Sequence, residues 1–130
     1  MLTPPQLLPS GLPPSSPAPL SHIAIVTDIW GTSGDDTLYA DSNVRSPLLS
    51  GIGSTVHGGE GQDTIYGGAG ADHLFGDSGI DTLYGGDNND VLDGGIGNDT
   101  MWGDAGNDQV YGGADDDKLH GGADNDTLVV

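Results

Sequence analysis

The stretch GGEGQDTIYGGAGADHLFGDSGIDTLY, residues 58–84, repeats one nine-residue pattern three times. Each copy opens with a glycine-rich hexad that ends in aspartate, and it closes with three residues whose middle side chain is aliphatic. Such hexads favour tight turns, because glycine adopts backbone conformations that other residues avoid. Neighbouring side chains of a strand point to opposite faces, so the three closing residues predict a short strand that buries one side chain.

The pattern continues in register on both sides of this stretch. Blocks of nine residues start at Gly31 and, after a gap that is two periods long, at every ninth residue from Gly58 to Gly121. Position one is glycine and position eight is aliphatic or methionine in every block. Position six is always aspartate, in Asp36, Asp63, Asp72, Asp81, Asp90, Asp99, Asp108, Asp117 and Asp126. This agreement in phase indicates a repeat architecture, whereas a disordered acidic linker would not keep it.

Position four predicts a further property of the turn. It is glycine in six blocks and Asn88, Asp115 or Asp124 in the other three. Asparagine and aspartate are the residues that, after glycine, best tolerate a left-handed backbone. We therefore expect position four to have a positive φ.

These blocks predict an all-β fold, a parallel β-roll, which is a kind of β-solenoid. Two nine-residue blocks form one flattened coil, and successive coils stack with their strands parallel. One coil buries almost no apolar surface by itself, so the coils stabilise one another only as a stack. Stacking also brings the position-six carboxylates of blocks two apart to the strand spacing of about 4.8 Å.

Carboxylates in rows this close repel one another unless cations lie between them. Carboxylate and carbonyl oxygens suit Ca²⁺, which accepts about six to eight oxygen ligands in flexible geometry. Zn²⁺ prefers nitrogen or sulfur, and Mg²⁺ requires a stricter octahedron. We expect several calcium ions between blocks two apart, with up to six interior sites from residue 58 onward, and a chain that is largely disordered without them.

Composition limits the partners of this chain. It has 130 residues and a formal net charge of −18, with 20 acidic residues against two basic ones, Arg45 and Lys118. Nucleic acid and anionic membranes are excluded as partners, because both require clustered lysine or arginine. No apolar run approaches the roughly 20 residues that a bilayer requires, so we expect no membrane insertion. Cysteine is absent, which excludes disulfides and thiolate metal sites.

The blocks GGEGQDTIY, GGAGADHLF and GGIGNDTMW resemble the GGxGxDxUx nonapeptide of the RTX, or haemolysin-type calcium-binding, repeat family. The resemblance covers residues 58–130 without interruption and also residues 31–39. It implies a β-roll that holds Ca²⁺ between turns through aspartate carboxylates and backbone carbonyls. Bacterial members of the family are typically exported by type I secretion and fold outside the cell. The resemblance therefore implies a secreted, extracellular protein with a type I secretion apparatus as a further partner.

The chain divides into three predicted regions. Residues 1–21 hold seven of the eight prolines, which predicts a disordered Pro-rich arm or linker without the features of a secretory signal peptide. Residues 22–57 begin with a β-branched run that predicts a lead-in strand, followed by one isolated repeat and a degenerate gap. Residues 58–130 are predicted to form the calcium-binding β-roll.

The degenerate gap, residues 40–57, is two periods long and so preserves the phase of the repeat. It has Arg45 and Ser54 at position six in place of aspartate. The block that contains Asp36 therefore lacks a neighbouring carboxylate at the usual spacing of two blocks.

Two functions of different classes are compatible with this sequence. The first is a non-enzymatic calcium-binding module whose folding depends on calcium, and we favour it. The second is the C-terminal fragment of an exported metalloprotease, lipase or epimerase with its catalytic domain upstream. We find no catalytic residues: the GDSG of residues 76–79 matches a serine-protease signature, but it forms positions one to four of an ordinary block.

Position nine carries six of the seven aromatic residues of the chain. Blocks two apart align four position-nine side chains in one stripe: Tyr66, Tyr84, Trp102 and His120. Ring contacts along such a stripe stabilise stacked strands. An alternative is that the stripe is an exposed docking surface for a glycan or a second roll.

Overall fold

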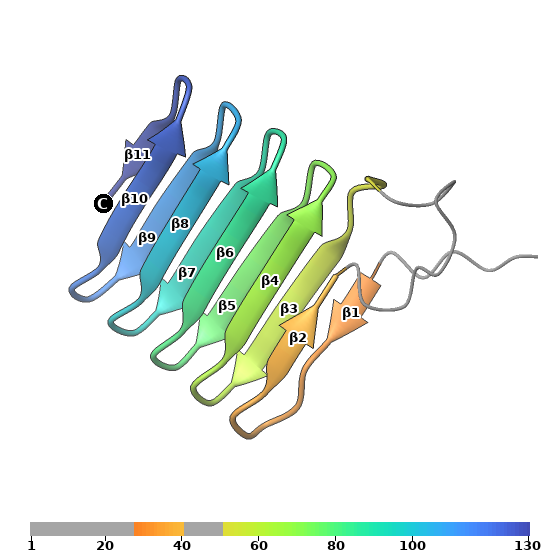
Figure 1. Cartoon of the computed structure of the whole chain (residues 1–130). Coiled ribbons are helices and arrows are strands. Elements are labelled where there is room, and N and C mark those ends of the chain that lie inside the picture. Colours follow the sequence, from red (N-terminus) through yellow and green to blue (C-terminus); the bar gives the residue numbers. More distant parts are fainter. Residues whose placement is uncertain (1–27, 41–50) are drawn as a thin grey trace, which may run out of the picture.

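A computed structural model describes residues 28–40 and 51–130, and these residues form eleven β-strands in two parallel sheets (Figure 1). The strands are β1 (Asp28–Trp30), β2 (Thr37–Tyr39), β3 (Thr55–Glu60), β4 (Thr64–Ala69), β5 (His73–Ser78), β6 (Thr82–Asp87), β7 (Val91–Ile96), β8 (Thr100–Ala105), β9 (Gln109–Ala114), β10 (Lys118–Ala123) and β11 (Thr127–Val129). The predicted Pro-rich arm and Arg45 lie outside the described residues.

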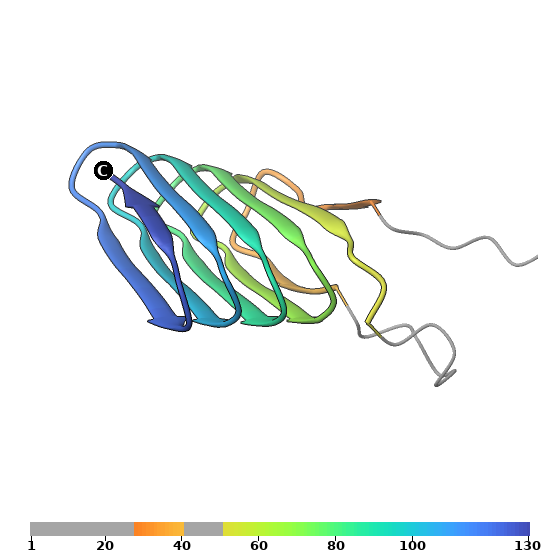
Figure 2. The same cartoon turned by 90° about the horizontal axis from the view of Figure 1, so that it is seen from above.

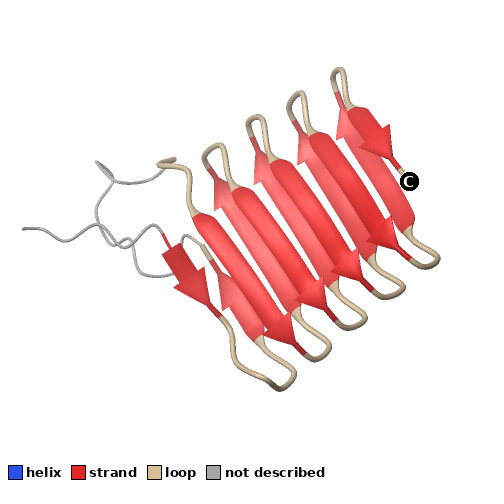
Figure 3. Ribbon diagram, turned by 180° about the vertical axis from the view of Figure 1, so that it is seen from behind, coloured by secondary structure: helices blue, strands red, loops and turns tan. Residues whose placement is uncertain are grey.

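Successive strands alternate between the two sheets. The odd-numbered strands form a six-stranded sheet in the order β1-β3-β5-β7-β9-β11, and the even-numbered strands form a five-stranded sheet in the order β10-β8-β6-β4-β2. Seen from above, the chain winds from one layer to the other and back, with a turn at each edge (Figure 2). The view from behind shows strands and connecting turns throughout (Figure 3). The predicted all-β parallel roll is confirmed.

The register of the strands shows how the degenerate gap is accommodated. Thr64 pairs with Thr82, and this separation of two blocks holds along the rest of the roll. At the start of the roll, Asp28 pairs with Thr55 and Thr37 pairs with Thr64, in each case over three blocks. The extra block falls between β2 and β3. Consequently the repeat at residues 31–39, which is isolated in the sequence, stacks directly on the block that starts at residue 58.

The core consists of one row of side chains from each sheet. These side chains come from position eight, and the fully buried ones are Val56, Ile65, Leu74, Leu83, Leu92, Met101 and Val110. Position one also faces inward, where glycine keeps the two layers close, and positions seven and nine face outward. This burial pattern confirms the predicted strand with one inward side chain.

Two positions of each turn from residue 58 onward have a left-handed backbone, whereas Gly34, at position four of the first turn, does not. Position four has positive φ from residue 61 onward, including Asn88, Asp115 and Asp124 at 81°, 87° and 80°, as predicted. Position two also has positive φ in the same turns, and the sequence reasoning missed it. Asp77 and Asp104 occupy position two at 71° and 76°. Their presence among glycines was the same signal that identified position four.

Aromatic rings stack along the outer face of both sheets. On the five-stranded sheet, ring centroids lie 4.8–5.2 Å apart and the planes are 5–7° from parallel along Tyr39, Tyr66, Tyr84, Trp102 and His120. On the other sheet, His57 lies between Trp30 and Phe75, with centroids at 4.0 and 4.6 Å. Asp93 takes the next place in this row. The predicted stripe exists, and its ring faces are covered mainly by one another.

No helix in residues 28–40 or 51–130 has the length and apolar character needed to cross a membrane.

The single-file core makes each inward side chain important for stability. We expect Leu83→Ala to lower the free energy of unfolding by about 2–5 kcal/mol, because Leu83 is fully buried and its truncation leaves a cavity. Ile80→Ala is the matched control, since Ile80 is 55% exposed and its change should cost about 0.5 kcal/mol or less. Urea unfolding in excess calcium measures both, and equal effects would contradict a core built from position eight.

Candidate metal centre

The turns place the nine position-six aspartates in two rows, one along each edge of the roll. The first edge, at the lower turns in Figure 1, joins odd-numbered to even-numbered strands and carries Asp36, Asp63, Asp81, Asp99 and Asp117. The second edge, at the upper turns, carries Asp72, Asp90, Asp108 and Asp126. Ser54 stands at the start of the second edge. The structure thus brings all nine predicted residues into the rows that the sequence indicated.

Each of the eight carboxylates from Asp63 onward is tied to the preceding coil by its Oδ1 atom. The backbone N–H of the position-six residue one coil earlier donates a hydrogen bond to it. On the first edge the donors are Asp36, Asp63, Asp81 and Asp99, at N···O distances of 2.8–2.9 Å. On the second edge they are Ser54, Asp72, Asp90 and Asp108, at 2.7–3.0 Å. The two ladders hold the side chains in one repeated orientation.

The other carboxylate oxygen, Oδ2, is buried and lacks a hydrogen-bond donor along most of both rows. This holds for Asp63, Asp81, Asp90, Asp99 and Asp108, each 1% exposed. Asp72 occupies the equivalent position on the second edge and is 0% exposed. A buried charged oxygen without a donor is costly, so the Oδ2 atoms of Asp63, Asp81, Asp90, Asp99 and Asp108 each require a positive partner.

Position-one glycines create the space around these oxygens. A Cβ atom on Gly76 would lie 2.6 Å from Asp81 Oδ2 and 2.6 Å from the carbonyl oxygen of Gly94 on the following coil. The carboxylate and the carbonyl therefore line the same small space between two turns. Both atoms are hydrogen-bond acceptors, so a cation with a preference for hard oxygen ligands satisfies them and a neutral acceptor does not.

Burial and neighbouring charge make these carboxylates unusual. Burial raises the pKa of Asp81 to about 7; the backbone N–H of Asp63 lowers this pKa in part, and the Asp99 and Asp63 carboxylates raise it further. Burial likewise raises the pKa of Asp90 to about 7. The pKa values of Asp63, Asp99 and Asp108 also rise, again chiefly because of burial. Ionised carboxylates are thus disfavoured here in the absence of a nearby positive charge.

The rows differ at their ends. Asp36 Oδ2 accepts hydrogen bonds from Thr32, from its backbone N–H at 2.6 Å and from its hydroxyl at 2.8 Å. These bonds lower the pKa of Asp36. At the opposite end, Asp117 and Asp126 are only partly buried, and no described turn stacks beyond them.

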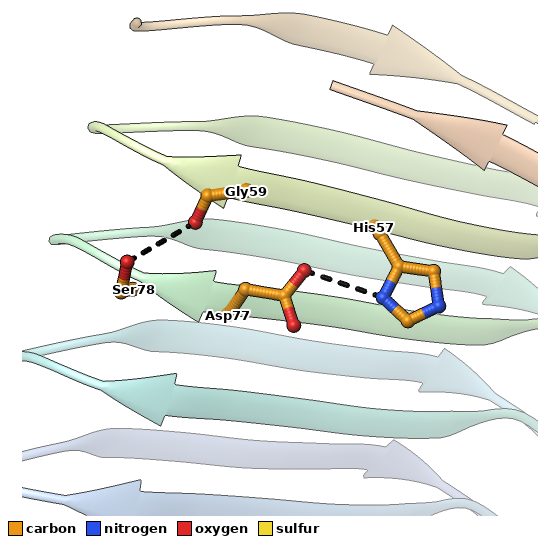
Figure 4. Close-up of polar contacts among 4 residues, drawn as sticks. All are labelled: His57, Gly59, Asp77 and Ser78. Carbon is orange, nitrogen blue, oxygen red and sulfur yellow. Dashed lines mark hydrogen bonds and ion pairs between the residues drawn. The ribbon is translucent and has the colours of Figure 1, made fainter. Parts of the chain in front are cut away.

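Side chains alone do not complete a metal site. Within residues 28–40 and 51–130, no three histidine, aspartate or glutamate side chains converge closely enough to hold an ion. His57 is instead on the outer face, with Nδ1 3.2 Å from Asp77 Oδ2 (Figure 4). Beside it, the Ser78 hydroxyl donates to the Gly59 carbonyl at 3.3 Å. At the six position-one glycines from residue 58 to residue 103, the space instead combines one aspartate Oδ2 with one backbone carbonyl of the following coil.

A second ladder at position five was missed by the sequence reasoning. The side-chain oxygen of Asn89 accepts from the backbone N–H of Asn107, and Asn107 repeats this with Asn125, both at 2.9 Å. On the first edge, Asn98 accepts from the Asp116 N–H at 3.1 Å. The available signal was asparagine at position five in four of the last five blocks. These bonds fix the spacing of the turns beside the aspartate rows.

A comparison of the sequence with known protein families finds one match. The family model described as RTX calcium-binding nonapeptide repeat matches the chain in four copies, at residues 28–43, 51–83, 71–101 and 94–128. Together these matches cover well over half of the chain. No curated protein and no solved structure is significantly similar to it.

The space beside the position-one glycine can be tested by filling it. We expect Gly76→Ala to destabilise the roll by about 1–3 kcal/mol through overpacking and to remove one bound cation, since the new Cβ meets Asp81 Oδ2 and the Gly94 carbonyl. Gly34→Ala is the matched control, because its Cβ meets nothing within 4 Å. Thermal unfolding and ion counting measure the two effects. A neutral Gly76→Ala would show that this space has no role.

Proposed function

The chain belongs to the RTX calcium-binding nonapeptide repeat family, and on that premise we propose that it is a secreted module whose β-roll forms when it binds Ca²⁺. One observation carries the proposal: buried Oδ2 atoms without donors face carbonyl oxygens between stacked turns. Six aspartates have an Oδ2 between two described turns of residues 58–126: Asp63, Asp72, Asp81, Asp90, Asp99 and Asp108. We assign one calcium ion to each.

In each site the aspartate Oδ2 and the position-one carbonyl of the following coil would hold the ion, with further turn carbonyls completing a shell of about six to eight oxygens. Calcium bound there would supply the positive charge that the buried carboxylates require. The chain contributes the orientation: Oδ1 is held by the preceding coil, and glycine keeps the space open. Every ion would thus join two coils.

The charge of the chain supports the same conclusion. The formal net charge is −18, and six divalent ions would contribute +12, which leaves −6. Without them, neighbouring carboxylates within each buried row repel one another across the strand spacing of about 4.8 Å. The core is only one side chain deep from each sheet, so apolar burial has little capacity to offset this repulsion. Folding is therefore coupled to calcium binding.

We place the protein outside the cell, where calcium is abundant. Extracellular calcium modules bind with dissociation constants of about 0.1–1 mM, so the chain would stay unfolded at cytosolic calcium and fold after export. An unfolded chain suits passage through a type I secretion apparatus, which we include as a partner. We assign the described roll a binding and folding role and no catalytic step.

A calcium titration followed by far-UV circular dichroism tests this proposal. We expect a largely disordered spectrum in excess chelator and a cooperative change to a β spectrum as calcium rises to about 0.1–1 mM. Magnesium at the same concentrations should produce a much smaller change, because its octahedral geometry suits a carbonyl-lined turn poorly. A complete β spectrum in chelator would refute calcium-dependent folding.

A single substitution tests the assignment of the ligands. Asp90→Asn removes the charge of a fully enclosed carboxylate, and we expect it to raise the calcium midpoint and lower the ion count by one. Asp87→Asn is the matched control, because it removes the same charge from an exposed side chain. Titration with ion counting by native mass spectrometry compares them. Equal effects of the two changes would mean that net charge, and not the Asp90 site, controls binding.

A further inference from the structure

The first turn of the roll, residues 31–36, differs from later turns at position two. Later turns from residue 58 onward have glycine or aspartate there, with φ between 71° and 116°. The first turn has Thr32, which does not have positive φ. A β-branched side chain strongly disfavours the left-handed region, so Thr32 directs the turn into a different conformation. Gly34, at position four, likewise lacks the positive φ of its counterparts.

This conformation aims two donors at the carboxylate of the turn. The backbone N–H of Thr32 donates to Asp36 Oδ2 at 2.6 Å, and its hydroxyl donates to the same oxygen at 2.8 Å. The Gly34 N–H in turn donates to the Thr32 hydroxyl oxygen at 3.3 Å. Asp36 Oδ2 therefore accepts two hydrogen bonds, one for each lone pair. The equivalent oxygen of Asp63 accepts no hydrogen bond.

The remainder of the first turn is built like a calcium site. The Asp36 N–H donates to Asp63 Oδ1 at 2.8 Å, which continues the ladder. A Cβ on Gly31 would meet the Gly58 carbonyl and lie 3.0 Å from Asp36 Oδ2, so the space between these turns is also present. Thr32 and the changed backbone at Gly34 thus distinguish this turn from the six turns to which a calcium ion is assigned above.

We propose that the first turn is a calcium-free cap, in which Thr32 supplies to Asp36 the compensation that an ion supplies to the later aspartates. The proposal rests on the function proposed above, because it concerns which turns bind the ion. Asp36, predicted from the sequence as a calcium ligand, is here assigned to the cap. In the folded roll, the first edge thereby begins with a carboxylate oxygen that the chain itself satisfies, without an ion in its own turn.

Thr32→Gly tests the cap by gain of a site. The change converts GTSGDD at residues 31–36 to GGSGDD, which matches the later hexads and permits positive φ at position two. We expect native mass spectrometry of the full chain to count six calcium ions in the parent and seven in Thr32→Gly. The double variant Thr32→Gly with Asp36→Asn should return to six. Thr32→Ser, which retains both donors, is the control and should also bind six.

The possible results separate the two proposals. A parent chain that binds no calcium overturns the proposed function and the cap together. A parent that binds calcium, with no gain in Thr32→Gly, overturns the cap alone. A gain that persists after Asp36→Asn also overturns it, because the new ion would then lie elsewhere. A gain of one ion that depends on Asp36 and is absent from Thr32→Ser supports it.

Discussion

The fold depends on carboxylates that are buried between coils and whose two oxygens have separate partners. In Asp81, Oδ1 accepts the Asp63 N–H of the preceding coil, while Oδ2 faces the Gly94 carbonyl of the following coil. The first contact is complete within the polypeptide and the second is not. The repeats therefore specify the backbone geometry, whereas the charge of the buried carboxylates must be balanced by a bound cation. The Oδ1 hydrogen bonds between coils explain why a chain with so small a core has so regular a structure.

Much of the fold follows from the sequence, because the position of a residue within its nine-residue repeat determines its place in the coil. The aliphatic residue at position eight predicted the buried row, and Asn88 at position four predicted a left-handed turn that the structure confirms. The nine aspartates were predicted to lie in rows, and they do. In each case nine-residue periodicity links a residue to its place in the coil, so no long-range information is needed.

Other features could not be predicted in this way. The three-block register of the first coil depends on which half of the degenerate gap takes part in the stack, and phase alone does not distinguish the two halves. The structure selects the half with Ser54 and Val56, since Val56 continues the core. The hydrogen bonds of Thr32 to Asp36 arise because one block has threonine at position two, and a consensus pattern ignores such a single difference.

The aromatic stripe was predicted, but its face-to-face stacking leaves mainly ring edges for any partner. Docking of a glycan or a second roll stays a prediction.

The alternation of strands between the two sheets restricts how such an array changes in length. One nine-residue block is half a coil, so the loss of a single block would transfer every later strand to the opposite layer. Loss of residues 85–93, for example, would move Trp102 from the face that carries Tyr84 to the face that carries Phe75. Loss or duplication of a whole two-block coil leaves each side chain on its own face. The segment between β2 and β3 is the exception, because its nine additional residues leave β3 paired with β1, so the rule applies to the array from β3 onward. The array is therefore counted in pairs of blocks, and the coil, rather than the nonapeptide, is the unit by which this roll can lengthen or shorten without mixing its two surfaces.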